Sequence, residues 1–379
     1  MRNTRNPELI ADNCPIGWQI PSVTKKEKEF LFELLETPSP TGFEMEGQRR
    51  WAEYIGRTAE KVECDAYGST WGILGGSGKK SVMLAAHADE IGYMVKQVTK
   101  DGFLRLDRLG GSDSATGRGR RLRILGDNGE VPGIIGNTAI HLRRDLAGEK
   151  TPQPHELWVD VGASSRDEVT KLGIRVGHPA VYCDGPMELN KDRIVSRAID
   201  NRIGGFIIAQ VMKKVAAAKT KPVFSLVCLN AVQEEIGGNG AQMATHRLRP
   251  DVCLCLDVTH ATDTPGINWG QHGEVKLGGG PTLTHGGANH PLVVKRLQAV
   301  AKAKRIPLQH EASSRNTGTD TDRIFTVREG VSSALVSLPL RCMHSVVETA
   351  DLGDVQQVVN LMAGFVLSLG AKDVFHQKL

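Results

Sequence analysis

Acidic residues and histidines recur directly after apolar runs along this chain. Each run has the length and composition of a buried strand, so a sheet built from these runs would present the polar side chains at one of its edges. The residues concerned are His87, Asp89, Asp200, Glu234, Glu235, Asp257 and His344. Open α/β enzymes build their sites in this way, and the pattern predicts such a sheet with a polar, metal-binding cluster.

The residue composition and the pattern of apolar residues change twice along the chain. Helical stretches precede a strand at 81–87, and strands alternate with helices after residue 190; one of these helices is expected to begin at Pro291 with Asn289 as its cap. Residues 92–190 are rich in glycine and in turn pairs such as Asp101-Gly102, which is typical of a small β barrel or sandwich. We therefore expect one α/β domain, residues 1–91 and 191–379, interrupted by a β domain at 92–190.

Charge and hydropathy exclude several classes of function. The net charge of +4 is small for 379 residues, and the basic residues are scattered, which argues against a nucleic-acid groove. The N-terminal stretch has no apolar core of signal-peptide length, and no segment has the roughly 18 consecutive apolar residues of a membrane span. These observations predict a soluble, cytoplasmic protein that binds neither nucleic acid nor membrane.

The cysteines give no sign of a disulfide framework. There are seven of them, an odd number, in a chain with no export signal. Cys253 and Cys255 are two residues apart in an apolar run, so they share a face of the expected strand. They are either a pair of thiolates or small apolar groups packed in the core.

Each candidate residue has a plain structural alternative. His87 and Asp89 share a strand face, so Asp89 could hold the ring of His87 through its second nitrogen, or both could be solvated at a strand end. Asp200 stands before a helical stretch and could simply cap it. Glu234 and Glu235 point to opposite sides at the end of a strand, so one could bind a metal while the other faces a water.

Asp257 and His344 taken singly could be polar residues at strand ends. The combination is what indicates chemistry, because two imidazoles and several carboxylates emerge at the same kind of position. Five of the side chains are of types that divalent metals prefer, with one free carboxylate and one supporting acid besides. Zinc fits such a mixed set of ligands, and cobalt and manganese tolerate it.

Several separated stretches of the chain carry a resemblance to a known family. It resembles the M42 metalloaminopeptidases, of the glutamyl aminopeptidase or TET type. The stretches are AAHADEIGYMV, RAIDNRIGG, VQEEIGGNGA, LDVTHATDTPG, GTDTD and LPLRCMHSVVE, with VDVGASSRDE in the insertion. The resemblance implies an α/β fold: a mixed-sheet, dizinc aminopeptidase-like catalytic domain with an inserted small β-barrel domain that mediates dimerisation.

The resemblance also implies two divalent metal ions per subunit, most often zinc or cobalt. Asp200 matches the residue that bridges the two ions in the family. His87 and Asp257 match the ligands that complete one site. Glu235 and His344 match those that complete the other.

The implied activity is removal of the N-terminal residue from peptides with free N-termini. Glu234 matches the general base, which takes a proton from a metal-bridged water, and Asp89 matches the residue that orients His87. The family forms homo-oligomers, with a dimer as building block and in many members a dodecamer. The same scaffold leaves open another metal-dependent hydrolase, such as a deacylase or an enzyme assigned as an endoglucanase, and a non-catalytic assembly protein.

Three stretches depart from the family pattern, and the first of them concerns specificity. In the GTDTD stretch, Asp322 stands where small residues are usual, and it joins Asp320 as a candidate for contacts near the substrate. A more acidic site would favour basic or polar N-terminal residues. The GGGP stretch at 278–281 lacks the lysine common in relatives, and Cys342 replaces a frequent aromatic residue.

Overall fold

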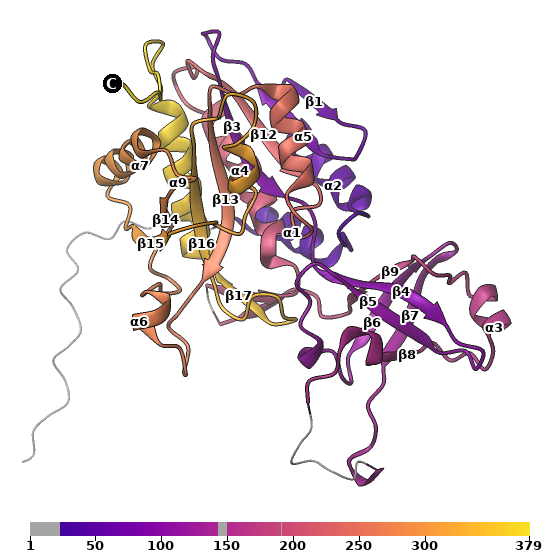
Figure 1. Ribbon diagram of the computed structural model, residues 1–379. Helices are drawn as coiled ribbons and strands as arrows, with labels where there is room; N and C mark the ends of the chain where they lie inside the picture. The colour runs from indigo at the N-terminus through magenta and orange to yellow at the C-terminus, as the bar shows by residue number, and fades with distance from the viewer. Residues whose placement is uncertain (1–22, 143–149, 191) are drawn as a thin grey trace, which may run out of the picture.

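The computed structural model describes residues 23–142, 150–190 and 192–379 (Figure 1). They form a large α/β domain and a smaller β barrel that projects from one end of it. The N-terminal stretch, in which the sequence shows no signal-peptide core, lies outside these residues, and so does Cys14. Within the described ranges, no helix is both long and apolar enough to cross a bilayer.

An eight-stranded mixed sheet forms the centre of the large domain. Across the sheet the order is β1 (Lys61–Cys64), β2 (Thr70–Leu74), β12 (Ser225–Ala231), β3 (Ser81–His87), β13 (Val252–His260), β16 (Ser333–Leu340), β14 (Thr282–Gly286) and β15 (Gln309–Ser313). The middle strands β12, β3, β13 and β16 run parallel to one another. They are apolar along most of their length because helices cover both faces of the sheet. The predicted α/β fold is confirmed.

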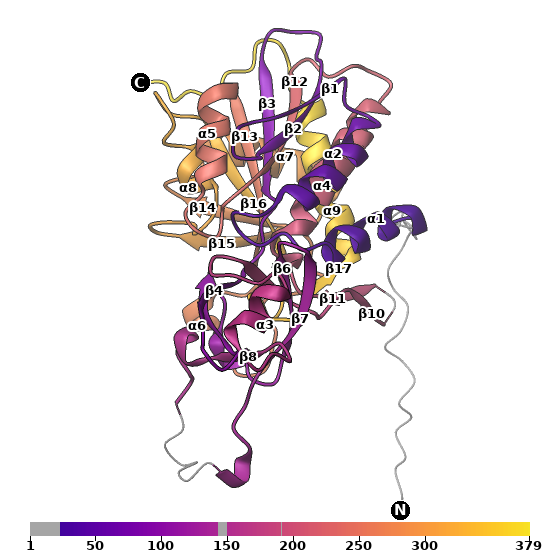
Figure 2. The same ribbon diagram turned by 90° about the vertical axis from the view of Figure 1, so that its right-hand side faces the viewer.

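Helices cover the two faces of this sheet unequally (Figures 1 and 2). One face carries α1 (Lys25–Glu36), α2 (Met45–Gly56), α4 (Ile199–Ala216), α7 (Pro291–Lys304) and α9 (Leu352–Leu367). The other carries α5 (Asn239–Leu248) and α8 (Thr321–Ile324). The short helix α6 (Trp269–His272) lies between β13 and β14 in the chain. The face beneath α5 and α8 is therefore only partly covered.

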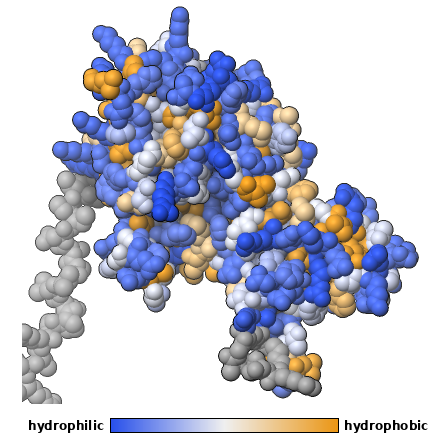
Figure 3. All heavy atoms as spheres, in the orientation of Figure 1, coloured by the Kyte–Doolittle hydropathy of each residue, from blue (hydrophilic) through white to orange (hydrophobic). Residues whose placement is uncertain are grey.

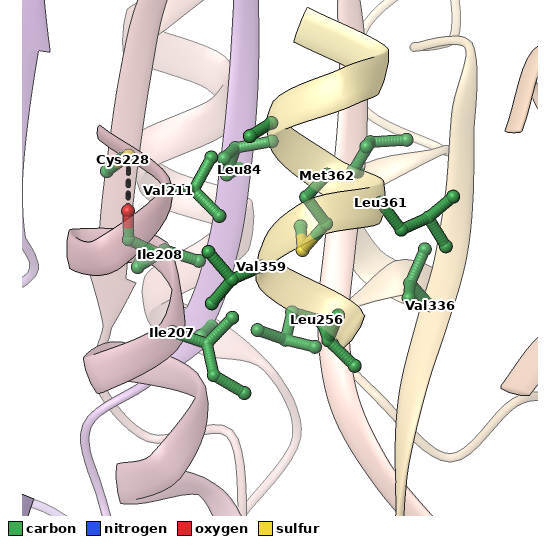
Figure 4. Close-up of a cluster of buried hydrophobic side chains, with 14 of the residues drawn as sticks. Leu84, Ile207, Ile208, Val211, Cys228, Leu256, Val336, Val359, Leu361 and Met362 are labelled. Carbon is green, nitrogen blue, oxygen red and sulfur yellow. Dashed lines mark hydrogen bonds between the residues drawn. The ribbon is translucent and has the colours of Figure 1, made fainter. Parts of the chain in front are cut away.

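The main core lies between the middle strands and the helices α4 and α9 (Figure 4). Ten of its members are Leu84, Ile207, Ile208, Val211, Cys228, Leu256, Val336, Val359, Leu361 and Met362. Each is almost completely buried, and a buried side chain of this size contributes about 1.5–3 kcal/mol to the free energy of folding. This packing holds the ends of the middle strands in a fixed arrangement.

The helix predicted to begin at Pro291 does so, but its cap is a different residue. His290 is the N-cap, and its Nδ1 accepts the backbone N–H of Leu292 at 3.4 Å. Asn289 is buried and turns toward the sheet, where its side-chain oxygen accepts the N–H of Leu335 at 2.7 Å. The expected cap is therefore wrong, because a strand offers Asn289 a shorter hydrogen bond.

A closed six-stranded barrel follows β3 in the chain. Around the barrel the order is β4 (Gly92–Val98), β5 (Leu104–Leu109), β8 (Trp158–Asp160), β7 (Gly129–Ile135), β6 (Arg121–Gly126) and β9 (Pro179–Tyr182). Its connections contain α3 (Arg166–Lys171), η1 (Ser114–Thr116), η2 (Ile140–Leu142) and η3 (Pro154–Glu156). The barrel has a core of its own, and Tyr93 and Tyr182 join its first and last strands by a hydrogen bond of 2.7 Å. Of the two alternatives, the insertion is a barrel.

A small antiparallel sheet lies below the large one and consists of β10 (Met187–Leu189), β11 (Arg193–Ser196) and β17 (Glu348–Asp351). The sequence predicts a strand that runs as far as Asp200. That strand ends at Ser196 and belongs to this small sheet, while Asp200 lies in the first turn of α4. A further correction concerns Asp257, which lies inside β13 rather than at its end.

Candidate metal centre

His87 and Asp257 project from neighbouring parallel strands on the same side of the large sheet. His87 shares its face of β3 with Met83 and Ala85, and Asp257 shares its face of β13 with Cys253 and Cys255, because residues two apart point the same way. All four of these neighbours pack under α5 and α8. The two candidate ligands therefore lie on the partly covered face, near the carboxyl-terminal edge of the sheet.

The other candidates reach this place from loops and a helix start. Glu234 and Glu235 follow β12, Asp200 comes from the first turn of α4, and His344 lies between β16 and β17. Asp200 is 7% exposed, whereas the side chain of His344 is 34% exposed. The cluster is thus buried on the side of Asp200 and open to solvent beside His344.

The seven side chains lie within a few ångströms of one another. Nε2 of His87 is 3.2 Å from Oδ1 of Asp200 and 3.8 Å from Oδ1 of Asp257. Nε2 of His344 is 3.4 Å from Oδ2 of Asp200 and 3.5 Å from Oε1 of Glu235. Two sets of potential ligands with mutual separations within 4.8 Å result, and Asp200 belongs to both: His87, Asp200 and Asp257, and Asp200, Glu235 and His344. A third such set is His87, Glu234 and Glu235.

Asp89 contacts both His87 and the backbone of the loop that carries Glu234 and Glu235. Its carboxylate accepts the backbone N–H of Glu234 at 3.0 Å and that of Glu235 at 3.1 Å, and it also accepts the hydroxyl of Thr41 at 2.9 Å. Nδ1 of His87 lies 3.2 Å from the main-chain oxygen of Asp89 and 3.4 Å from its carboxylate. Asp89 therefore touches the second ring nitrogen of His87, as expected, and in addition fixes the backbone of the glutamate loop.

The charge balance of the cluster favours a cation. Burial raises the pKa of Asp257 and Glu234 well above the usual carboxyl range and also raises the pKa of Glu235. Hydrogen bonds to Asp200 and Glu235 raise the pKa of His344 to about 11. Burial thus makes the ionised forms of several carboxyl groups costly at this place, and a bound cation would reduce that cost.

The donor set fits a pair of borderline divalent cations. Imidazole nitrogens and carboxylate oxygens are the ligands that zinc and cobalt accept, and the two sets that share Asp200 each contain one histidine and two carboxylates. Asp200 belongs to both sets and presents one carboxylate oxygen to His87 and the other to His344. The chemistry of the cluster therefore suits divalent cations.

Unfavourable backbone geometry accompanies the candidate residues. Ala198 precedes Asp200 by two positions and has φ 59°, Gln233 precedes Glu234 and has φ 59°, and His344 itself has φ 60°. A non-glycine residue in this left-handed region costs about 1–2 kcal/mol. Such conformations persist where the surrounding structure enforces them, and they cluster at functional sites.

The barrel domain approaches the cluster through two glycines that follow β5. A Cβ at Gly111 would lie 2.4 Å from Nδ1 of His344, and one at Gly110 would lie 2.9 Å from Cβ of Glu235. Real Cβ atoms do not approach that closely, so only glycine fits at Gly111 with His344 in its present place. The inserted domain therefore forms part of the wall of the site.

The sequence reasoning did not single out Glu348. This residue is 1% exposed in β17, and its carboxylate accepts the backbone N–H of Asp200 at 3.1 Å and that of His344 at 2.8 Å. The sequence indicates a role for Glu348 through its position in the stretch LPLRCMHSVVE alone. Its hydrogen bond to Asp200 joins segments far apart in the chain, which the sequence pattern does not show.

The structure separates the two aspartates of the GTDTD stretch. Asp320 is 1% exposed, neither of its carboxyl oxygens has a hydrogen-bond partner among the residues that the structure describes, and burial raises its pKa to about 7. Asp322 instead accepts the backbone N–H groups of Thr317 and Gly318 at 3.0 and 2.9 Å. Asp322 therefore stabilises its own loop, and Asp320 is the acid of this stretch that contributes negative charge near Glu234.

The GGGP stretch and the cysteine pair have structural explanations, whereas nothing in the structure explains Cys342. Gly278 and Gly280 have positive φ, and their N–H groups each donate to the buried carboxylate of Asp354 at 2.7 Å. Cys253 and Cys255 are completely buried, and burial raises the pKa of both thiols. The thiolate interpretation is wrong, and the two cysteines are part of the core beneath α5.

Sheet topology, inserted barrel and a cluster of histidines and carboxylates at the sheet edge are features of a metal-dependent α/β enzyme. The model of the M42 glutamyl aminopeptidase family matches residues 68–361, and the chain belongs to this family of metal-dependent aminopeptidases. It is 33% identical over 349 residues to the lysyl aminopeptidase of Pyrococcus furiosus, an alignment that covers 91% of this chain and 98% of that protein. The resemblance noted in the sequence is confirmed.

Solved structures show the same fold. An aminopeptidase from the archaeon Desulfurococcus kamchatkensis superimposes with a TM-score of 0.85 at 33% identity, over 92% of this chain and 96% of that one. The TET1 peptidase of Pyrococcus horikoshii superimposes with a TM-score of 0.80 at 25% identity, over 90% of this chain and all of that one. The latter is described as able to assemble into a tetrahedron or a large octahedral shell.

Proposed function

We propose that this aminopeptidase removes the N-terminal residue from peptides with free N-termini by means of two divalent cations, zinc or cobalt. The observation that carries the proposal is the position of Asp200. One of its carboxylate oxygens faces His87 and the other faces His344, so it stands between two sets of ligands. His87 and Asp257 would complete one cation site, and Glu235 and His344 the other.

Glu234 is the general base in this proposal. Its side chain is 12% exposed, it lies 3.9 Å from Nε2 of His87, and it belongs to neither of the two sets that share Asp200. When bound, the cations would supply Lewis acidity to the scissile carbonyl and lower the pKa of the attacking water. Glu234 takes the proton from the attacking water and returns it to the leaving amine.

The substrate approaches from the side of His344, where the cluster is open to solvent. A free α-amine is a ligand or hydrogen-bond donor for this negatively charged centre, which restricts cleavage to the first peptide bond. An acylated N-terminus is uncharged and lacks that attraction. The family match lends no support to a deacylase, an endoglucanase or a non-catalytic assembly protein.

We further infer that the chain forms homo-oligomers through its barrel domain, with a dimer as the building block. The barrel exposes large apolar side chains, visible as orange patches in Figure 3. These include Ile134, Ile140, Leu142, Leu172 and Val176. The assembly described for the TET1 peptidase supports the same inference. Sedimentation analysis of the intact protein tests it.

The decisive experiment measures release of free amino acids from lysyl, glutamyl and leucyl peptides, each with a free or an acetylated N-terminus. Protein stripped with a chelator and reloaded with Zn²⁺ or Co²⁺ should trim only the free peptides, and the panel gives the preferred residue. Glu234→Gln should lower kcat by at least about 100-fold, the usual contribution of general base catalysis, with metal content unchanged. Equal hydrolysis of acetylated peptides would favour a deacylase, and full activity of Glu234→Gln would remove Glu234 from the mechanism.

A further inference from the structure

Glu348 joins two segments that carry candidate ligands. It lies at the start of β17, opposite Ser196 of β11, and its side chain is buried between α4 and the 341–347 segment. One carboxylate oxygen accepts the N–H of Asp200 and the other accepts the N–H of His344. Asp200 and Glu348 are 148 residues apart in sequence, so this contact is made only by the folded chain.

The two N–H groups that Glu348 accepts belong to backbone that regular structure does not satisfy. Asp200 is in the first turn of a helix, where N–H groups have no partner within the helix. His344 has a left-handed backbone conformation outside any strand or helix. Without an acceptor, both segments would be free to rotate their side chains away from one another.

We propose that Glu348 is a positioning residue for one of the two cations, the one assigned to Asp200, Glu235 and His344. It acts through the backbone: by fixing Asp200 and His344 at the same time, it sets the 3.4 Å approach between their side chains. Asp89 fixes the backbone of the loop after β12 in a similar way, because it accepts the N–H groups of Glu234 and Glu235. This inference rests on the proposed dinuclear site.

A purely structural carboxylate in the same chain provides a matched control. Asp354 is also buried, and it also accepts two backbone N–H groups, those of Gly278 and Gly280. Neither glycine belongs to the cluster. Glu348→Gln and Asp354→Asn therefore make equivalent chemical changes, and each replaces an oxygen that accepts a hydrogen bond with an amide NH₂ group. Only the first change affects candidate ligands.

The test is calorimetric titration of metal-free protein with Zn²⁺, combined with circular dichroism to establish that each variant is folded. Wild type is expected to bind two ions. Glu348→Gln should bind one ion with wild-type affinity and the other at least tenfold more weakly, the usual effect of removing a residue that orients metal ligands. Asp354→Asn should bind both ions as wild type does. His344→Gln should weaken binding of the same ion that Glu348→Gln weakens.

Each result has a definite meaning. If folded Glu348→Gln binds both ions normally, or if Asp354→Asn weakens the same ion, the positioning role is wrong. If Glu348→Gln does not fold, Glu348→Asp takes its place, because the shorter side chain keeps the carboxyl group but cannot span both N–H groups. Failure of both variants to fold would show that Glu348 maintains the fold and would overturn the proposal. Wild type that binds fewer than two ions would refute the dinuclear function itself, whatever Glu348 does.

Discussion

Replacing Asp89 by asparagine should weaken both the glutamate loop and the binding of metal. Asp89 is completely buried and accepts the N–H groups of Glu234 and Glu235, and hydrogen bonds to a charged group contribute about 1.5–3 kcal/mol each. Asparagine keeps one acceptor oxygen but turns an NH₂ group toward the other donor. We therefore expect the free energy of unfolding of the metal-free protein to fall by about 3 kcal/mol.

The effect of Asp89→Asn on the free energy of unfolding depends on the pH at which unfolding is measured. Burial alone would raise the pKa of Asp89, but contact with His87 and the two backbone N–H groups outweigh burial and hold it below the usual value. A depressed carboxyl pKa in the folded state contributes stability above the unfolded pKa, and that stability is lost as the pH falls through the folded pKa. Denaturant unfolding should therefore be followed at neutral pH, where Asp89 is ionised.

The metal affinity of the same variant tests whether Asp89 also orients His87. Loss of the anionic contact to Nδ1 of His87 should weaken Zn²⁺ binding by 10- to 100-fold, measured by competition with a chromophoric chelator. Asp65→Asn is the control, because Asp65 accepts the N–H groups of Tyr67 and Ser69 in a turn outside the cluster. A Zn²⁺ affinity within threefold of wild type in folded Asp89→Asn would refute the reasoning and leave Asp89 as a support of the loop only.

Two further predictions concern a glycine at the site and a buried carboxyl group away from it. Gly111→Ala places a methyl group 2.4 Å from Nδ1 of His344 and should displace that ring. We therefore expect loss of one bound Zn²⁺ and of peptide hydrolysis. Gly287→Ala is the control, because its methyl group meets no described atom within 4 Å, and it should leave both unchanged. Burial raises the pKa of Asp354 from 3.8 to about 6, so its contribution to stability is present below about pH 4 and lost as the pH rises through 6. The unfolding free energy of wild type relative to Asp354→Asn should therefore fall by about 3 kcal/mol across this interval in denaturant titrations, and a flat difference would contradict the assignment.

The positions of the candidate residues relative to strands could be read from the sequence because parallel strands in an open sheet present their ends at one edge. Apolar runs before His87, Glu234 and Asp257 are strands of the large sheet, and the glycine-rich region supplies the closed barrel, whereas β10 pairs with β11 in the small sheet. The run before Asp200 was misassigned, since apolar periodicity does not tell which sheet a short strand joins. That strand pairs with β17, which lies more than 150 residues further along the chain.

The sequence by itself determined the types of side chain available, the α/β character of the large domain and the family to which the chain belongs. Only the tertiary structure decided which of these side chains come into contact. Long-range hydrogen bonds connect Glu348 and Asp89 to the backbone of candidate ligands, and close packing brings Gly111 of the barrel against His344. Asp322, by contrast, accepts hydrogen bonds from its own loop. The physical reason is that periodicity reports the burial of a residue along its own segment, whereas a site is made by contacts between segments that only the packed core brings together.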